Sequence, residues 1–162
     1  MSSKQKKLVV VDGNALIHRA FHALPPLSTK SGKLVNAVYG FITIFLKVLK
    51  DLKPDFLVLT FDKKAPTFRH KAFKEYKATR IKQPQELYDQ IPLVKELVRA
   101  FRVPIFEKDG FEADDLIGTI SHQKSLLRDN LKTIIVTGDL DTLQLVNDHT
   151  EVYTLKKGIA DI

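Results

Sequence analysis

Short apolar runs alternate along this chain with segments of helical spacing, and this alternation limits the possible folds more than any other feature. The apolar runs are rich in Val, Ile, Phe and Thr, as buried strands are. They occupy residues 8–11, 56–61, 103–106, 132–137 and 151–155. Strands that alternate with helices predict an α/β fold, with a mostly parallel twisted sheet and helices on both of its faces.

Helical patterns fill the intervals between the apolar runs. The clearest pattern starts at Val35, carries apolar residues at helical spacing as far as Leu49, and ends before Pro54. We expect further helices at residues 14–23, 68–81, 86–101, 114–128 and 140–146. The chain has 162 residues, 44% of them hydrophobic, which suits one domain with a substantial core.

Composition excludes several classes of site. The chain has no cysteine, so it has no disulfide framework, no zinc-thiolate site and no thiol nucleophile. The N-terminal residues MSSKQKK are followed by only four apolar residues, too few for a signal peptide or a membrane span. We therefore expect a cytoplasmic protein without a membrane partner. The formal net charge of +7 is compatible with a polyanionic partner.

Acidic residues follow four of the predicted strands. Parallel strands end at one edge of a sheet, where several carboxylates would repel one another unless a divalent cation lay between them. Two Mg²⁺ or Mn²⁺ ions held there could activate a water and orient a phosphate for in-line hydrolysis. The pattern predicts a metal-dependent phosphodiester enzyme that acts on nucleic acid. Its candidate metal ligands are Asp12, Asp62, Glu112, Asp114, Asp115, Asp139 and Asp141.

These acids also have structural explanations. Asp12 and Asp139 stand where helix N-caps are expected. Acids at residues 112–115 would each gain about 0.3–1 kcal/mol from the dipole of the helix that they open. Asp62 precedes two lysines and could form a surface ion pair with them. Because acids recur at four strand ends, we favour the metal interpretation over capping alone.

Residues 63–82 form a one-sided basic segment, with nine Lys, Arg or His residues and one acid. If the segment is helical, one face combines aromatic surface with cations, as channels for single-stranded nucleic acid do. An ordinary solvated helix is the alternative. Because Asp62 is close in sequence, we favour a clamp on a single strand or 5′ end, and we expect Arg19 to contact the scissile phosphate. The predicted face consists of Phe73, Tyr76, Lys77 and Arg80.

Five motifs follow one another along nearly the whole chain: VVDGNALIHRAFHALPPLSTKSG, NAVYGF, FDKKAPTFRHKAFKEYKATR, GFEADDLIGT and VTGDLDTLQLV. In order and spacing they resemble the 5′ nuclease domain of bacterial DNA polymerase I and related flap endonucleases. The resemblance implies a PIN-like fold with a basic helical arch and Mg²⁺-dependent phosphodiester hydrolysis. It also implies 5′-3′ exonuclease activity and removal of DNA 5′ flaps or RNA primers during DNA replication and repair.

The resemblance assigns roles to individual residues. The family's metal carboxylates correspond to the seven acids named above. Tyr76, Lys77 and Arg80 correspond to the arch, Arg69 to its base, and Arg19 to a residue that faces the phosphate. The implied catalytic set is Asp12, Asp62, Glu112, Asp114, Asp115, Arg19 and Lys77. The implied nucleic-acid-binding set is Arg19, Arg69, Tyr76, Lys77 and Arg80.

The chain departs from the family pattern at its end. Family members continue into a helix-turn-helix-like region with a GDxSDNxPGVxGIG-type stretch, which supplies two more aspartates and grips duplex DNA, whereas this sequence stops at GIADI. We expect residues 1–162 to be an N-terminal fragment with an incomplete second metal site, linked in the full-length protein to a polymerase domain. A non-catalytic nucleic-acid-binding module is the alternative. An aspartate-dependent phosphatase is less favoured, because Asn14 stands where its second acid is needed.

Overall fold

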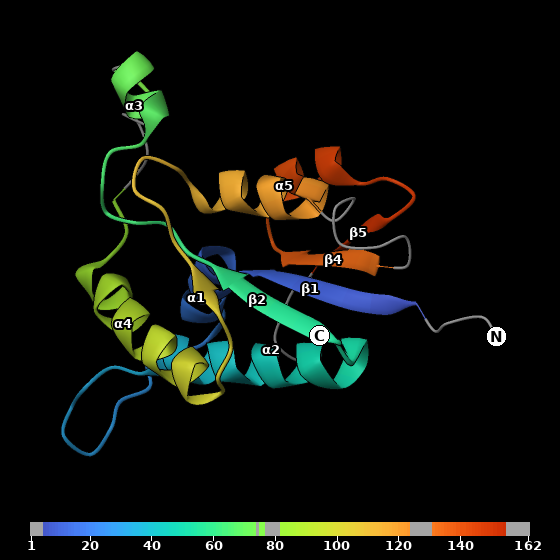
Figure 1. Ribbon diagram of the computed structural model, residues 1–162. Coiled ribbons are helices and arrows are strands. Elements are labelled where there is room, and N and C mark those ends of the chain that lie inside the picture. The colour runs from blue at the N-terminus through green and yellow to red at the C-terminus, as the bar shows by residue number, and fades with distance from the viewer. Residues whose placement is uncertain (1–4, 74, 77–81, 124–130, 155–162) are drawn as a thin grey trace.

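Five parallel strands form the central sheet (Figure 1). The computed structural model describes residues 5–73, 75–76, 82–123 and 131–154. The order across the sheet is β3-β2-β1-β4-β5, and every pairing is parallel, so the carboxyl ends of the strands lie along one edge. The strands are β1 (Lys6–Asp12), β2 (Phe56–Thr60), β3 (Ile105–Phe106), β4 (Leu131–Thr137) and β5 (Thr150–Thr154).

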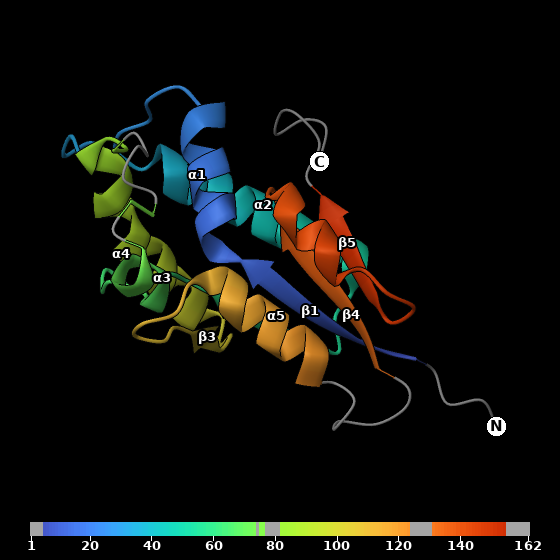
Figure 2. The ribbon, with the colours of Figure 1, turned by 90° about the horizontal axis from the view of Figure 1, so that it is seen from above.

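Helices cover both faces of the sheet, as the sequence predicts. One face carries α1 (Gly13–Ala23), α2 (Asn36–Leu52) and α4 (Gln85–Ala100), and the other carries α5 (Ala113–Gln123) and the 3₁₀-helix η2 (Leu140–Leu145). In the view from above, α5 lies over the sheet and α2 beneath it (Figure 2). No helix within the described residues is long and apolar enough to cross a membrane.

Alternation along β1 divides the core into two clusters. Val9 and Val11 pack with α1, α2 and α4, whereas Leu8 and Val10 pack with Ile117 of α5. Successive side chains of a strand point to opposite faces, so a strand buried on both sides reads as the unbroken apolar run seen in the sequence. The larger cluster lies on the α1, α2 and α4 side and positions these helices beneath the carboxyl edge.

Several predicted boundaries differ from the structure. The third strand begins at Ile105 rather than residue 103, since Pro104 has no N–H to donate to a ladder and contributes only its carbonyl, which accepts from Leu59. The segment expected as a helix over 140–146 is a 3₁₀-helix over Leu140–Leu145. The predicted helix 114–128 is described as far as Gln123, and residues 124–130 lie outside the described part of the chain.

The prediction of one helix over residues 68–81 is wrong at its centre. The helix α3 (Phe68–Ala72) ends before Phe73, whose backbone is extended, and Tyr76 lies in a turn. Phe73 therefore does not share a helical face with Tyr76. None of the residues in α3 is buried, so no packed apolar face stabilises a longer helix. Lys77 and Arg80 lie outside the described residues.

Gly13 lets α1 start directly against the core. A Cβ at this position would lie 2.4 Å from ring carbons of Phe61, which is fully buried and has no room to move aside. Gly13 follows Asp12 and Phe61 precedes Asp62, so this close approach sets the spacing of the first two candidate acids.

We predict that Gly13→Ala lowers the free energy of unfolding by about 1–3 kcal/mol, because the added methyl group overpacks the Phe61 ring. Denaturant unfolding measures the change. Gly118→Ala in α5 is the matched control: its Cβ would meet only Leu145, at 3.9 Å, and should be neutral or stabilising. Equal effects of the two substitutions would show that the Phe61 contact does not matter.

Candidate active site

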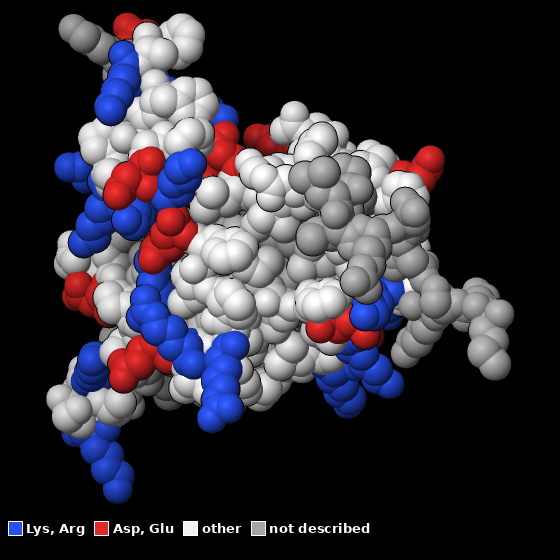
Figure 3. Space-filling view, in the orientation of Figure 1, with Lys and Arg blue, Asp and Glu red and all other residues white. Residues whose placement is uncertain are grey.

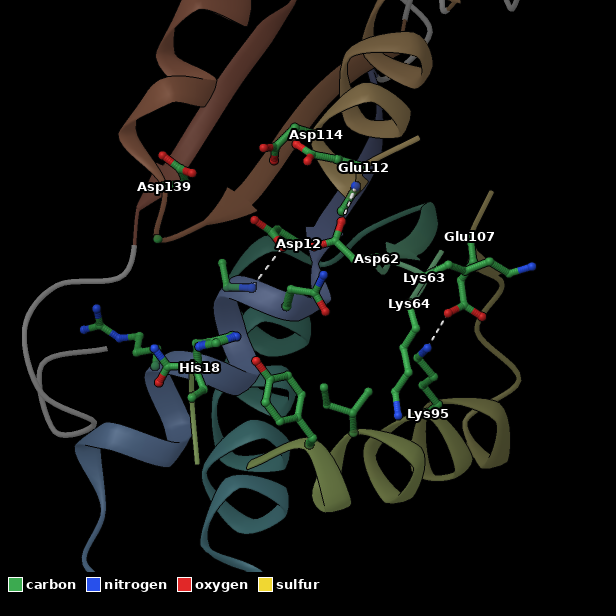
Figure 4. Close-up of a pocket in the computed structure, with 18 of the residues that line it drawn as sticks. Asp12, His18, Asp62, Lys63, Lys64, Lys95, Glu107, Glu112, Asp114 and Asp139 are labelled. Carbon is green, nitrogen blue, oxygen red and sulfur yellow. Dashed lines mark hydrogen bonds and ion pairs between the residues drawn. The ribbon is translucent and has the colours of Figure 1, made fainter. Parts of the chain in front are cut away.

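The carboxyl edge of the sheet opens into a cleft of about 1080 Å³, bounded by α1, α4 and the start of α5. Five of the seven predicted acids line it, from four separate segments of the chain, and Figure 4 shows their carboxylates gathered around one end. Arg19 lines the same cleft. The five acids are Asp12, Asp62, Glu112, Asp114 and Asp139.

Asp12 is the most buried of these acids, with 4% of its surface exposed. Its Oδ1 accepts a hydrogen bond from the Ala15 amide at 3.0 Å and so caps α1, while its Oδ2 accepts one from the Thr137 hydroxyl at 2.8 Å. The pairing of Val11 with Val136 in the sheet brings Thr137 beside Asp12. Thr137 was not predicted from the sequence, although its place at the end of the neighbouring strand was a usable signal.

Burial raises the pKa of Asp12 above its ordinary value. The hydrogen bonds from Ala15 and Thr137 act in the opposite direction, and the nearby negative charges of Asp62 and Asp139 raise the pKa further. The surroundings of Asp12 therefore disfavour its ionised form. A bound cation would stabilise the ionised form.

Asp62 links the end of β2 to the start of α5. Its Oδ1 accepts a hydrogen bond from the Ala113 amide at 2.6 Å, which satisfies one of the free N–H groups of that helix. Of the two lysines that follow Asp62, Lys63 pairs with Asp109 at 3.1 Å instead. The structural explanation considered for Asp62, an ion pair with its neighbours, therefore does not hold for Lys63.

Asp115 and Asp141 line a second, smaller cleft rather than the first. Asp115 accepts a hydrogen bond from the Glu112 amide at 2.9 Å, one half of a capping box, and forms a bidentate ion pair with Arg69 at 2.7 and 2.8 Å. These contacts raise the pKa of Arg69 above its ordinary value. Glu112 and Asp114 line both clefts and join the two groups of acids.

Two of the predicted nucleic-acid-binding residues contact the acids in this structure. Arg69 lies 3.7 Å from Glu112 in addition to pairing with Asp115, and the Tyr76 hydroxyl donates to Glu112 at 3.2 Å. Arg19 differs from both, because its Nε and Nη2 atoms are buried without a hydrogen-bond partner among the described residues. A half-buried guanidinium with two unpartnered nitrogens is suited to an anionic ligand.

Capping and lining the cleft are not alternatives here. Asp139 accepts a hydrogen bond from the Asp141 amide at 2.9 Å and caps η2, yet it also lines the first cleft, as Asp12 does.

Within the described part of the chain, no three Asp, Glu or His side chains are close enough to hold one ion directly. The described acids are thus gathered around a common cleft, but they do not form such a three-ligand group.

Positive charge surrounds this end of the molecule. Figure 3 shows Lys and Arg interleaved with Asp and Glu on the side where the strands end, while the middle of the same view is mostly uncharged. The first cleft itself is lined by Arg19, Lys63, Lys64, Lys95 and Arg99. The sequence predicted acids at this edge and a basic segment over residues 63–82, but the two cations of α4 were not predicted.

Comparison with known proteins identifies the family of this chain. The family described as 5′-3′ exonuclease, N-terminal resolvase-like domain, matches residues 7–161. The chain belongs to the 5′-3′ exonuclease family. Members similar to it include DNA polymerase I of Bacillus subtilis, 46% identical over 99% of the chain, and DNA polymerase I of Bacillus caldotenax, 43% identical over 98%. The chain spans 18% of the length of either polymerase.

Solved structures place the exonuclease-family chain in the PIN-like fold of flap endonucleases and exonucleases. The T5 D15 protein co-crystallised with metal ions has a TM-score of 0.75 at 20% identity, covering 93% of this chain and 55% of its own. Human GEN1 in complex with Holliday junction DNA has a TM-score of 0.54 at 14% identity, covering 96% and 37%. At these identities the likeness concerns the fold alone.

We predict that Asp12→Asn stabilises the folded chain near neutral pH when divalent cations are chelated. The pKa of Asp12 is raised by folding, so the ionised carboxylate destabilises the fold above that raised pKa, and this cost disappears as the pH falls toward 3.8. Asn can keep both hydrogen bonds, because the Thr137 hydroxyl can accept as well as donate.

Thermal unfolding across a pH series measures this effect, with about 2–4 °C in Tm for each kcal/mol regained in a domain of this size. The expected gain is largest at neutral pH and shrinks on acidification. Asp109→Asn, at an exposed carboxylate outside the cleft, is the control and should change little. A Tm gain for Asp12→Asn that does not depend on pH would contradict the electrostatic explanation.

Proposed function

We propose that this chain is the metal-binding part of a structure-specific 5′ nuclease that hydrolyses phosphodiester bonds in 5′ flaps or primers during DNA replication and repair. The observation that carries the proposal is the gathering of five acids from four chain segments around one cleft in a member of the 5′-3′ exonuclease family. Related structures support it, since one T5 D15 flap endonuclease complex contains DNA and metal ions.

The donor set fits Mg²⁺ or Mn²⁺. Carboxylate oxygens are the hard ligands that these ions prefer, and Mg²⁺ retains several waters, so acids that do not form a three-ligand group can still share an ion through water. Asp12, Asp62 and Asp139 would hold an ion in the first cleft. Asp115 and Asp141 would contribute on the side of the second cleft, with Glu112 and Asp114 between the two.

Bound there, such ions supply Lewis acidity toward a phosphate oxygen and lower the pKa of a water. The other steps belong to side chains of the protein. Arg19, with two nitrogens lacking partners in the described structure, would bind and orient the scissile phosphate. Lys77 and Arg80, assigned through the family resemblance, would draw the single strand toward the cleft and offset the charge that develops on the phosphate.

We also propose a covalent partner and a DNA substrate. The relatives named DNA polymerase I are far longer than this chain, which favours a polymerase region as the partner within one polypeptide. The Rad2 catalytic core, which shares the fold at a TM-score of 0.51, is named as a complex with DNA substrate. RNA primers remain part of the proposed substrate class through the same family resemblance.

Asp62→Asn tests the metal site. The Asn side chain can still accept from the Ala113 amide, so the variant removes the charge and keeps the cap. We predict that Mg²⁺- or Mn²⁺-dependent cleavage of a 5′-labelled flap falls about 100-fold or more, since several kcal/mol of charge stabilisation are lost. Asp109→Asn serves as the control. Equal cleavage by Asp62→Asn and wild type would exclude the site, and no cleavage by either would favour a non-catalytic binding module.

Lys77→Ala combined with Arg80→Ala tests the arch. We predict weaker binding to single-stranded 5′ flaps and a log–log salt slope that is shallower by about 1.4, the value for two lost phosphate contacts. Fluorescence anisotropy over a salt series measures both quantities. Lys6→Ala with Lys50→Ala removes the same charge near the amino ends of the strands and should leave the slope close to wild type. An unchanged slope in the arch variant would remove these residues from the proposal.

A further inference from the structure

One face of α4 forms the wall of the first cleft away from the acids. Tyr88, Pro92, Lys95 and Arg99 follow one another at spacings of four, three and four residues, and Ile91 lies beside them. Such spacing places side chains on one side of a helix. The core-facing stripe is a different set: Leu87, Gln90, Val94 and Val98. The helix therefore has one face for the core and another for the cleft.

Tyr88 supplies aromatic surface to this wall. Its side chain is 36% exposed, and no hydrogen bond or ring contact engages it within the described residues. The adjoining Ile91 is partly buried and packs on the main core, so the wall beside the ring is firm. A flat ring beside a firm apolar surface is suited to stacking with another planar group.

Two cations beside this wall are not engaged elsewhere. Lys64 and Arg99 are exposed, and neither forms an ion pair within the described part of the structure. Figure 4 shows the Lys64 side chain extending toward α4. By contrast, Lys95 is paired with Glu107 and lies 5.0 Å above the Phe61 ring, and Lys63 is paired with Asp109.

The cleft is thus divided by charge. The five predicted acids occupy one end, and an aromatic ring with two available cations occupies the α4 side, where the one acid of the lining, Glu107, is paired with Lys95. A phosphate is repelled from the acids but attracted by Lys64 and Arg99. A base needs a planar surface, and two aromatic rings line this cleft, His18 of α1 and Tyr88 of α4; Tyr88 is the larger ring and shares the α4 side with Arg99. The ligand that matches both features is a nucleotide with an unpaired base.

We propose that the α4 wall is a subsite for unpaired nucleic acid, in which one base stacks on Tyr88 while phosphates of that nucleotide and its neighbours in the strand contact Lys64 and Arg99. This subsite rests on the proposed function, since it deepens the specificity of the same cleft. Stacking of this kind selects single-stranded nucleic acid over duplex and does not select a sequence, because every base has a stacking face.

The first test measures binding of a fluorescent single-stranded oligothymidine by anisotropy in EDTA, where no cleavage occurs. Tyr88→Ala should weaken binding about tenfold, and Tyr88→Phe should bind like wild type, because the ring is kept. Tyr39→Ala, at a tyrosine of α2 that is 56% exposed and outside the cleft, is the control. Thermal unfolding of each variant confirms that folding is unaffected.

The second test separates stacking from charge. An oligonucleotide without bases should bind wild type as weakly as normal oligothymidine binds Tyr88→Ala, and the two losses should not add when the variant meets the baseless strand. Lys64→Gln with Arg99→Gln should instead make the salt slope shallower by about 1.4 with either strand. Additive losses would place the stacked base on some other residue and overturn the proposal.

A parallel assay of Mg²⁺-dependent flap cleavage by wild type distinguishes the two proposals. If wild type cleaves the flap but Tyr88→Ala binds oligothymidine as wild type does, the subsite is excluded and the nuclease function stands. If wild type binds oligothymidine through Tyr88 but cleaves nothing, the nuclease function fails and the subsite stands. Absence of oligothymidine binding by wild type would exclude the subsite.

Discussion

The buried carboxylate of Asp12 is the constraint on which the rest of this site depends. Parallel pairing of β1 with β2 and β4 brings it to the same edge as Asp62 and Asp139, and the Ala15 amide and Thr137 hydroxyl fix both of its oxygens. The cost of burying this charge is visible in its raised pKa. The pairing of the strands therefore decides which acids share this edge.

The sheet and the first cleft were largely predictable because they follow from short-range signals. Buried parallel strands read as unbroken apolar runs, and the acids that follow them must meet at the common edge. The failures occur where tertiary contacts decide. The segment after Phe68 has helical spacing, but α3 stops at Ala72 because it has no core to pack against. The α4 wall of the cleft was not predicted, because the spacing of Tyr88 and Arg99 shows that they share a helix face but not which surface that face meets.

The separation of Asp115 and Asp141 from the other acids also lay beyond sequence reasoning. The three acids at the start of α5, Glu112, Asp114 and Asp115, are close in sequence, yet one turn of helix directs them toward different clefts. Asp115 points toward Arg69, and Asp114 reaches the boundary of both clefts. Capping a helix and lining the cleft are compatible for Asp12 and Asp139. A carboxylate has two oxygens and about four lone-pair sites, so it can accept a bond from a helix N–H and still offer lone pairs to the cleft.

The bidentate pair of Arg69 with Asp115, together with the bond from Tyr76 to Glu112, has a mechanical consequence. These contacts link Arg69 of α3, and Tyr76 in the turn after it, to the acids at the start of α5. On the proposed function, a strand that displaces that segment must either break both hydrogen bonds of the Arg69–Asp115 pair or move the start of α5 with it. Binding of a strand at α3 and the positions of the acids at the start of α5 would then be coupled.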